Sequence, residues 1–203
     1  MFVTYNTIID ARRKEGSADK ASTLFDEMTS SGIQPTVVTY SILIHGYSVR
    51  GCWKEGIRVF REMADKGISP NVITFTTLMR SLCKRGATSE AHKLFKLMVE
   101  RGEKPDAITH SVLLYGYSLE DHFNELDILL HSMCHEGLRL NLHNYNSLIH
   151  GYCKNQKLDG VLNIFKQRQE EKVRPNIVTY AILLDGLCKI GRRCSKYHQS
   201  DGK

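Results

Sequence analysis

Hydrophobic residues recur along this chain at helical spacing, in short segments that end near glycine or proline. In the segment 37–49, Tyr40, Leu43, Ile44 and Tyr47 fall at i, i+3, i+4 and i+7. Positions with this spacing lie on one face of an α-helix, because the helix has about 3.6 residues per turn. The segment is therefore predicted to be a helix with its apolar face buried.

A second hydrophobic segment follows the first. From about residue 54 to residue 65, Ile57, Phe60 and Met63 keep helical spacing, and Gly67 ends the segment. The same two segments return along the chain, and in four places the first of them ends at a glycine: Gly16, Gly51, Gly86 and Gly191. Each pair of segments predicts two antiparallel helices joined by a short turn.

The pairs follow a fixed period of 35 residues, which Pro35, Pro70 and Pro105 mark. Related stretches stand at this point of each period: PTVVTYS at 35–41, PNVITFT at 70–76, PDAITHS at 105–111, LNLHNYN at 140–146 and PNIVTYA at 175–181. A fixed period of about 20 to 50 residues is the signature of a solenoid, in which each repeat packs only on its neighbours. The predicted fold is therefore an all-α solenoid of helix-turn-helix repeats.

Five complete repeats and a partial one fill most of the chain. They cover residues 2–36, 37–71, 72–106, 107–141 and 142–176, with the partial sixth at 177–191. Residues 192–203 lack an apolar period and are predicted to be a disordered tail. Neither end has a polar capping repeat, so we expect a truncated product or a fragment of a longer array.

The fourth repeat departs most from the pattern. His110 replaces the tyrosine of the other repeats, and Asp121 replaces the turn glycine. Leu140 stands where the other repeats have proline, and Lys172 in the fifth repeat stands where they have the helix-ending glycine. We expect a degenerate fourth repeat and looser joints at Leu140 and Lys172, because proline and glycine fix the path of the chain.

Charge and cysteine content narrow the class of protein. Lys and Arg outnumber Asp and Glu by 28 to 22, and the net charge of +6 is compatible with a polyanionic partner without demanding one. The six cysteines include no C-x-x-C pair, and Cys83, Cys153 and Cys188 share one repeat position, which predicts buried thiols and a reducing compartment. No apolar run approaches the roughly 20 residues of a membrane span. No targeting leader is visible before the first repeat.

Enzyme signatures are missing from the sequence. It contains no phosphate-binding glycine loop, no zinc-deaminase signature, no nucleophile motif and no acidic cluster suited to a metal-dependent nuclease. His131 and His135 lie four apart on one predicted helix with Cys134 between them. No further ligand follows in a recognised pattern, which favours a solvated helix face over a metal site. We expect no catalysis, no cofactor, no metal and no small-molecule substrate.

Several stretches resemble the pentatricopeptide repeat family. They are VTYNTII at 3–9, ASTLFDEM at 21–28 and GISPN at 67–71, and the resemblance covers residues 2–191. It implies a right-handed superhelix that binds single-stranded RNA at one base per repeat. It also implies a plant protein of the mitochondrion, or alternatively of the chloroplast. There it would support the processing, stability, editing or translation of an organellar transcript, together with other RNA-processing proteins.

In that family the fifth and the thirty-fifth residues of a repeat together select the base. Here the pairs are Asn6 with Thr36, Ser41 with Asn71, Thr76 with Asp106, Ser111 with Asn141, and Asn146 with Asn176. An ionised Asp only accepts hydrogen bonds and favours guanine or uracil, whereas an Asn amide donates to a bare ring nitrogen of adenine or cytosine. Ser or Thr at the fifth position leaves room for a purine, and Asn fits against a pyrimidine. The repeats then predict the core 5′-pyrimidine-A-G-A-pyrimidine-3′; the alternative is that these are ordinary helix-start and turn residues.

Two further sets of residues follow from the resemblance. The second residue of a repeat is implied to sandwich the bases, and this set is Val3, Val38, Ile73, Ile108, His143 and Val178. The thirteenth residue is implied to face the phosphates, and this set is Lys14, Lys84, Lys154 and Lys189. Val49 and Leu119 leave the second and fourth repeats without that charge. Exposed helix ends commonly carry lysine, which is the alternative explanation of this set.

Two other sets of residues at equivalent repeat positions have structural explanations. The threonines before the apolar face are expected to cap or open the first helix: Thr4, Thr39, Thr74, Thr109 and Thr179. The aromatic residues that follow are expected to pack between repeats rather than to stack on bases: Tyr5, Tyr40, Phe75, Tyr145 and Tyr180.

Two other functions stay open from the sequence. A helical scaffold like the tetratricopeptide arrays would bind proteins on its concave face, and a truncated remnant would have no independent activity. Base reading needs a variable polar pair at fixed positions, and peptide binding does not. The pairs above therefore make RNA binding the first hypothesis.

Overall fold

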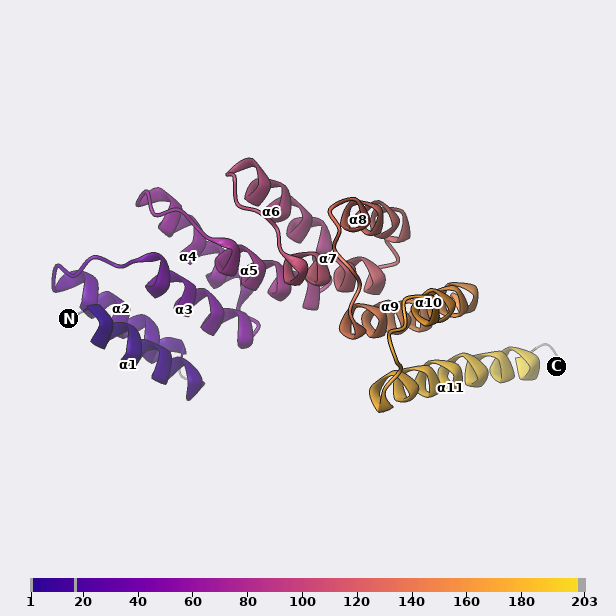
Figure 1. The fold of residues 1–203 in the computed structure, drawn as a ribbon. Helices are drawn as coiled ribbons and strands as arrows, with labels where there is room; N and C mark the ends of the chain where they lie inside the picture. The colour runs from indigo at the N-terminus through magenta and orange to yellow at the C-terminus, as the bar shows by residue number, and fades with distance from the viewer. Residues whose placement is uncertain (1, 17, 201–203) are drawn as a thin grey trace. The chain divides into compact units, whose positions relative to one another are not determined.

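The chain is an all-α helical repeat solenoid, as the sequence predicts. The structure is a computed structural model that describes residues 2–16 and 18–200. In these ranges it has eleven helices and no strand (Figure 1). The helices are α1 (Phe2–Lys14), α2 (Ala18–Ser30), α3 (Val37–Val49), α4 (Trp53–Asp65), α5 (Val72–Lys84), α6 (Thr88–Glu100), α7 (Ala107–Leu119), α8 (Phe123–His135), α9 (Leu142–Lys154), α10 (Leu158–Glu170) and α11 (Ile177–Ser200). No helix in the described ranges is both long and apolar enough to cross a lipid bilayer. The hand of the superhelix stays a prediction.

The chain divides at Thr109 into two compact units, which we call the N-terminal half (up to Thr109) and the C-terminal half (from His110). In the N-terminal half, α1 packs on α2, α3 on α4 and α5 on α6, while α1, α3 and α5 lie side by side (Figure 1). Gly51 follows α3 with a φ of 73°. That left-handed conformation costs glycine little and turns the chain into α4.

Aromatic pairs join successive repeats of the N-terminal half. Phe25 of α2 meets Tyr40 of α3 edge to face, with ring centroids 5.3 Å apart, and Phe60 of α4 meets Phe75 of α5 at 5.2 Å. Tyr40 and Phe75 are completely buried. The prediction that these aromatic residues pack between repeats is confirmed at these two positions and is wrong at Tyr180, which is 51% exposed.

A core position of the C-terminal half carries an arginine. There α9 packs on both α10 and α11, and Tyr145 of α9 is completely buried. Arg168 of α10 is also completely buried, and none of its three guanidinium nitrogens has a hydrogen-bond partner among the described residues. Burial lowers the pKa of Arg168 below its ordinary value. The equivalent residue of the other complete repeats is methionine: Met28, Met63, Met98 and Met133.

The last helix differs from the prediction. α11 runs to Ser200, so it continues through Gly191, where the sequence analysis ended the helix, and residues 192–200 are helical rather than disordered. A helix interior tolerates one glycine at a cost of about 1 kcal/mol, and in the described part of the chain no further helix turns back onto α11. Residues 201–203 of the predicted tail lie outside the described residues.

One of the three cysteines that were predicted to be buried is exposed. Cys83 and Cys153 are buried as predicted, but Cys188 on α11 is exposed. Leu184 and Leu187 beside it are also exposed. α11 packs on α9, and in the described ranges no second helix of its own repeat covers Leu184 and Leu187.

Two residues that replace a turn glycine keep the geometry that glycine gives elsewhere. Asp121 and Lys172 have φ values of 63° and 58°, in the same left-handed region as Gly51 and Gly67 at 73° and 71°. The expectation of a looser joint at Lys172 therefore finds no counterpart in its φ value, and the looser joint expected at Leu140 stays a prediction. What differs is the conformational free energy, which is higher at Asp121 and Lys172 because this region is strained for a residue with a Cβ atom.

Candidate nucleic-acid interface

The last residue of a repeat caps the first helix of the next repeat. Asn71 is the N-cap of α5: its Oδ1 accepts the backbone N–H of Thr74 at 3.0 Å, and its own N–H donates to Thr74 Oγ1 at 3.1 Å. This reciprocal capping box satisfies two N–H groups that a helix start leaves unpaired. Thr36 and Asn141 occupy the same place before α3 and α9. The helix-start explanation of these residues is thus confirmed, and their base-selecting role stays a prediction.

The capping residue also meets the fifth residue of its own repeat, through the buried third residue of the next one. In the second repeat, Ser41 Oγ lies 3.4 Å from Thr74 Oγ1, which in turn donates to Asn71 Oδ1 at 2.6 Å. Thr74 is completely buried. The structure therefore brings the two predicted base-selecting residues together, although they are 30 positions apart in the sequence.

The orientation of the Asn71 amide follows from these bonds. A backbone N–H can only donate, so the atom that faces Thr74 N must be the carbonyl oxygen of Asn71. The hydroxyl of Thr74 donates to the same oxygen. Since Oδ1 is occupied from inside, the Nδ2 group with its two hydrogens is directed away from the buried threonine.

The third repeat has the same arrangement with a carboxylate. Asp106 Oδ1 accepts the backbone N–H and the hydroxyl of Thr109, both at 2.8 Å, and Thr109 Oγ1 lies 2.9 Å from Thr76 Oγ1. Partial burial raises the pKa of Asp106, but the hydrogen bonds from Thr109 and neighbouring backbone N–H groups outweigh it and hold the pKa below its ordinary value. Asp106 is thus ionised at neutral pH and offers only acceptor atoms.

In the first repeat, the hydroxyl of the buried threonine donates to the fifth residue instead of the thirty-fifth. Thr39 Oγ1 donates to Asn6 Oδ1 at 2.8 Å and accepts the backbone N–H of Thr36 at 3.1 Å. The Thr36 and Thr39 hydroxyls are 3.4 Å apart. Here the fifth residue, Asn6, is the one whose amide oxygen is held by the buried threonine.

The fifth repeat offers two acceptors to one proton. Thr179 Oγ1 lies 2.8 Å from Asn146 Oδ1 and 3.0 Å from Asn176 Oδ1, and its backbone N–H also donates to Asn176 Oδ1 at 3.0 Å. A hydroxyl has a single hydrogen, so it serves one of the two side chains at a time. The fifth residue of this repeat is therefore held less firmly than that of the first.

The fourth repeat uses an amide in place of the threonine. Asn144 Nδ2 donates to Ser111 Oγ at 2.6 Å, and Asn144 Oδ1 accepts the backbone N–H of Asn141 at 2.9 Å. The backbone N–H of Asn144 donates to Asn141 Oδ1 at 3.0 Å. All five predicted pairs thus meet at the third residue of the following repeat, through hydrogen bonds in four repeats and through a 3.4 Å contact between hydroxyl oxygens in the second.

The sequence predicted only a capping role for the threonines at this third position and no role for Asn144. The structure makes the third residue both part of the capping box and the bridge between the paired residues, always 33 positions after the fifth residue. The signal in the sequence was the regular placement of a small polar residue next to an apolar face. These residues are all buried: Thr39, Thr74, Thr109, Asn144 and Thr179.

The ten predicted base-selecting side chains differ in accessibility. Thr76 and Ser111 are nearly buried, with 7% and 8% of their surface exposed. Five are half-buried: Asn6, Thr36, Ser41, Asn71 and Asn146. Three are exposed: Asp106, Asn141 and Asn176. In the third and fourth repeats the thirty-fifth residue is therefore the more accessible member of the pair.

The second residue of each repeat is exposed despite being apolar in five cases. The exposed fractions are 62% for Val3, 53% for Val38, 65% for Ile73, 55% for Ile108 and 49% for Val178. His143 of the fifth repeat is exposed as well. Apolar side chains at regular positions outside the core are suited to contact planar rings such as bases, and their sandwiching role stays a prediction.

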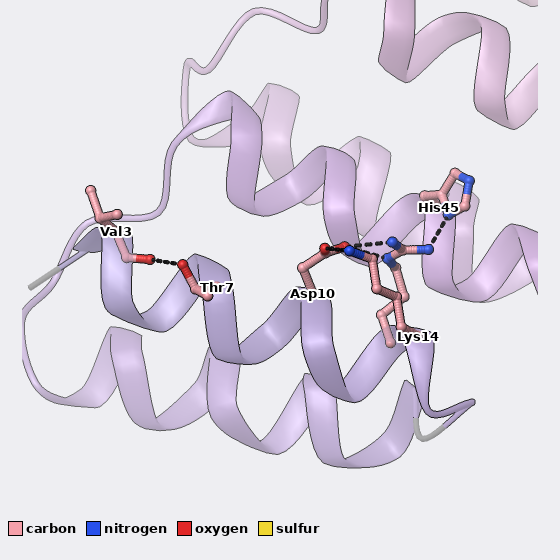
Figure 2. Close-up of polar contacts among 6 residues, drawn as sticks. Val3, Thr7, Asp10, Lys14 and His45 are labelled. Atoms are coloured by element: carbon pink, nitrogen blue, oxygen red, sulfur yellow. Dashed lines mark hydrogen bonds and ion pairs between the residues drawn. The ribbon is translucent and has the colours of Figure 1, made fainter.

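The lysines at the thirteenth position are exposed, and three of them have contacts. Lys14 pairs with Asp10 at 2.8 Å (Figure 2) and Lys189 pairs with Asp185 at 2.5 Å, in both cases one turn along the same helix. Lys154 Nζ donates to the backbone oxygen of Leu119 at 3.2 Å. Exposed ion pairs of this kind contribute little stability, so they leave the lysines available to a stronger anion.

A further cationic group joins the first two repeats. Arg13 donates to Asp10, and its Nη1 lies 2.8 Å from His45 Nδ1 (Figure 2). The pKa of Asp10 is lowered chiefly by the hydrogen bond from Lys14, with Arg13 adding to the effect and burial opposing it. Burial and the charges of Arg13 and Arg80 lower the pKa of His45, so its neutral ring accepts from Arg13. Sequence reasoning missed this contact because it looked only at the thirteenth position.

No metal centre is found among the described residues, which contain no cluster of three or more His, Cys, Asp or Glu side chains suited to hold an ion. His131, Cys134 and His135 are all exposed on α8. His131 Nδ1 lies 3.1 Å from the backbone oxygen of Asp127, which is a bond within its own helix.

Comparison with known proteins places this architecture among repeat proteins. The sequence model described as the PPR repeat family matches residues 2–49, 43–84, 70–119 and 140–189. No curated protein matches the chain. The pentatricopeptide repeat protein PPR10 from maize is similar in structure, with a TM-score of 0.80 and 22% identity, and the match covers 100% of this chain but 29% of PPR10.

Two similar structures contain RNA. PPR10 in complex with an 18-nt psaJ RNA element gives a TM-score of 0.81 at 22% identity, over 94% of this chain and 28% of that one. The PPR domain of Arabidopsis thaliana protein-only RNase P 1, solved in complex with tRNA, gives 0.74 at 17% identity, over 92% and 98%. At these identities the likeness shows the fold. The chain spans less than a third of PPR10.

Proposed function

The chain belongs to the PPR repeat family, and from that membership we propose that it binds single-stranded RNA and reads one base with each complete repeat. The observation that carries the proposal is the link, made in five successive repeats, between the fifth and thirty-fifth residues. A helix cap alone needs no such link to the preceding helix. The RNA in the PPR10 and RNase P 1 complexes supports RNA as the ligand.

Base choice is proposed to follow from hydrogen-bond polarity. Asn71 turns its N–H groups away from Thr74 and donates to the bare ring nitrogen of adenine. Asp106, ionised at neutral pH, accepts the ring N–H of guanine. The predicted core 5′-pyrimidine-A-G-A-pyrimidine-3′ is retained on this basis, with the amino end of the protein toward the 5′ end of the RNA.

Affinity without sequence preference is proposed to come from the two other sets. The exposed aliphatic residues beside the pairs, such as Val38 and Ile73, contact the faces of the bases. The exposed lysines at the thirteenth position, Lys84 among them, neutralise phosphates. Binding should therefore have a salt-dependent part from phosphates and a base-dependent part from the pairs.

The protein is proposed to act by occupying its RNA rather than by cleaving it. A bound strand is shielded from nucleases or kept open for processing, editing or translation, and other RNA-processing proteins would do the chemistry. The mitochondrial location, with the chloroplast as alternative, stays a prediction.

The first test measures binding to short RNAs that carry the core C-A-G-A-C or permuted cores. Fluorescence anisotropy at two salt concentrations separates the phosphate contribution from the base contribution. Selective binding to C-A-G-A-C is the expected result. Equal, salt-sensitive binding to every core would reduce the chain to a basic solenoid, and no binding to any core would favour the protein scaffold or the inert remnant.

A substitution sharpens this test. Asn71→Asp replaces an outward amide by a carboxylate and should shift the preference at the second base from adenine toward guanine, changing the ratio of the two affinities at least about ten-fold. Asn163→Asp is the matched control, because it makes the same charge change on the exposed surface of α10. It should weaken all cores equally or leave them unchanged. An unaltered base preference in Asn71→Asp would contradict the proposed code.

A further inference from the structure

Two repeats of this chain carry the same base-selecting pair but hold it differently. Both pairs consist of a serine at the fifth position and an asparagine at the thirty-fifth, and the buried residue that links them is threonine in one case and asparagine in the other. The sets are Ser41, Asn71 and Thr74 in the second repeat, and Ser111, Asn141 and Asn144 in the fourth. The second and fourth repeats can therefore be compared directly, because within these sets they differ only at the linking residue.

In the second repeat the amide of Asn71 is fixed by two donors. Its Oδ1 accepts the backbone N–H of Thr74 at 3.0 Å and the hydroxyl of Thr74 at 2.6 Å. If the amide turned over, its NH₂ group would face the backbone N–H of Thr74 and lose that hydrogen bond. The Thr74 hydroxyl would then have to accept from the NH₂ group and give up its 2.6 Å bond to Oδ1, with Ser41 Oγ at 3.4 Å as the nearby acceptor for its proton. The hydroxyl of Ser41 donates to the backbone oxygen of Val37 at 2.7 Å and so does not compete for Asn71.

In the fourth repeat the amide of Asn141 is fixed by one donor. The side chain of Asn144 gives its NH₂ to Ser111 Oγ at 2.6 Å and uses its carbonyl to accept the N–H of Asn141 at 2.9 Å. Among the described residues, only the backbone N–H of Asn144 donates to Asn141 Oδ1, at 3.0 Å. Turning this amide over therefore costs that one hydrogen bond and does not disturb the bond between Asn144 and Ser111.

We propose that the third residue of the following repeat is a specificity-determining position, because it sets how firmly the thirty-fifth residue presents its N–H groups to the base. The inference rests on the proposed function. An outward NH₂ donates to N1 of adenine, whereas a turned amide presents oxygen and accepts the N1–H of guanine. A firmly held amide thus separates adenine from guanine more sharply than a loosely held one.

The hydroxyl bond from Thr74 to Asn71, which the fourth repeat lacks, sets the size of the effect. The second repeat is expected to prefer adenine over guanine by a ratio about five times that of the fourth repeat, although their base-selecting pairs are identical. Overall affinity for the C-A-G-A-C core should change much less than this ratio. A residue with a purely structural role would alter affinity for all RNAs together.

The experiment exchanges the two linking residues. Thr74→Asn and Asn144→Thr each introduce a residue that the chain already uses at the equivalent position. Dissociation constants are measured for C-A-G-A-C, C-G-G-A-C and C-A-G-G-C, in which guanine replaces the second or the fourth base. Circular dichroism checks that each variant keeps its helices, and if one variant does not fold, the other decides alone.

Each outcome has a distinct meaning. Thr74→Asn should lower the adenine-to-guanine ratio at the second base about five-fold, Asn144→Thr should raise it at the fourth base by a similar factor, and neither should affect the other base. Equal ratios at both bases in the parent protein, unchanged by the exchange, would overturn this inference and leave the proposed function standing. Absence of any adenine preference at both bases in the parent would overturn the proposed function, and the inference with it.

Discussion

The N-terminal and C-terminal halves use the same helices and turns but differ in how well their residues suit them. Up to Thr109, the joints after the helices are glycines with φ values between 71° and 79°. In the C-terminal half, Asp121, Gln156 and Lys172 adopt φ values of 63°, 61° and 58° at equivalent joints. The two halves thus share the same backbone conformation at these joints. This conformation costs more free energy in the C-terminal half, because left-handed conformations favour glycine by roughly 1–2 kcal/mol.

The core positions give the same contrast. Met63 fills its place between helices, whereas Arg168 puts a guanidinium group into the equivalent place without a hydrogen-bond partner among the described residues. Leu140 replaces the proline of the other joints. The comparison shows that packing against neighbouring repeats determines the backbone geometry. Residues that do not suit this geometry lower the stability of the half that contains them. We expect the C-terminal half to unfold before the N-terminal half.

The largest expected effect comes from the buried arginine. Arg168→Met should raise the free energy of unfolding of the C-terminal half by about 2 kcal/mol or more, because it removes an unpaired charged group from the core. Urea denaturation followed by circular dichroism measures the change. The reverse exchange, Met63→Arg, serves as control and should destabilise the N-terminal half by at least as much. A loss of stability in Arg168→Met would show that the guanidinium has a stabilising partner.

A smaller effect is expected at the joint after the second helix. Lys172→Gly should stabilise the C-terminal half by about 1 kcal/mol, because glycine adopts the left-handed conformation at little cost. Gly67→Ala is the matched control with the opposite expected sign. A Cβ atom at Gly67 would meet nothing within 4 Å, so the expected loss of stability comes from the strained φ of 71°. It should destabilise by about 1 kcal/mol. Thermal melting of both variants tests the prediction, and shifts of the same sign would contradict it.

The smallest effect is expected where proline is missing. Leu140→Pro should stabilise by about 0.5 kcal/mol through the lower entropy of the unfolded chain, given that four other repeats carry proline at this point. Leu140 is nearly buried, so some lost apolar contact will offset the gain. Denaturant titration resolves a change of this size only with replicate measurements. A loss of more than 1 kcal/mol would mean that the fourth joint differs in conformation from the others.

The sequence by itself determined the repeat, its two helices and the candidate columns. Leu43 and Ile44 have apolar counterparts in every repeat, and such a regular apolar face is typically buried against neighbouring repeats. Helix bounds followed from glycine and proline, whose backbone preferences are local. For the same reason the chemistry of Asn71 and Asp106 was readable, because donor and acceptor capacity belongs to the residue itself.

Only the tertiary structure decided which polar groups meet. Ser41 and Thr74 are 33 positions apart, and their contact depends on how α3 and α5 pack, which no local pattern states. The end of α11 was likewise not readable from the sequence, because α11 continues through Gly191 to Ser200 although the equivalent glycines follow the ends of α1, α3 and α5. Long-range contacts arise from the fit of whole repeats. The third residue could therefore be seen from the sequence as a helix cap, but its link to the base-selecting pair appeared only when the repeats were packed.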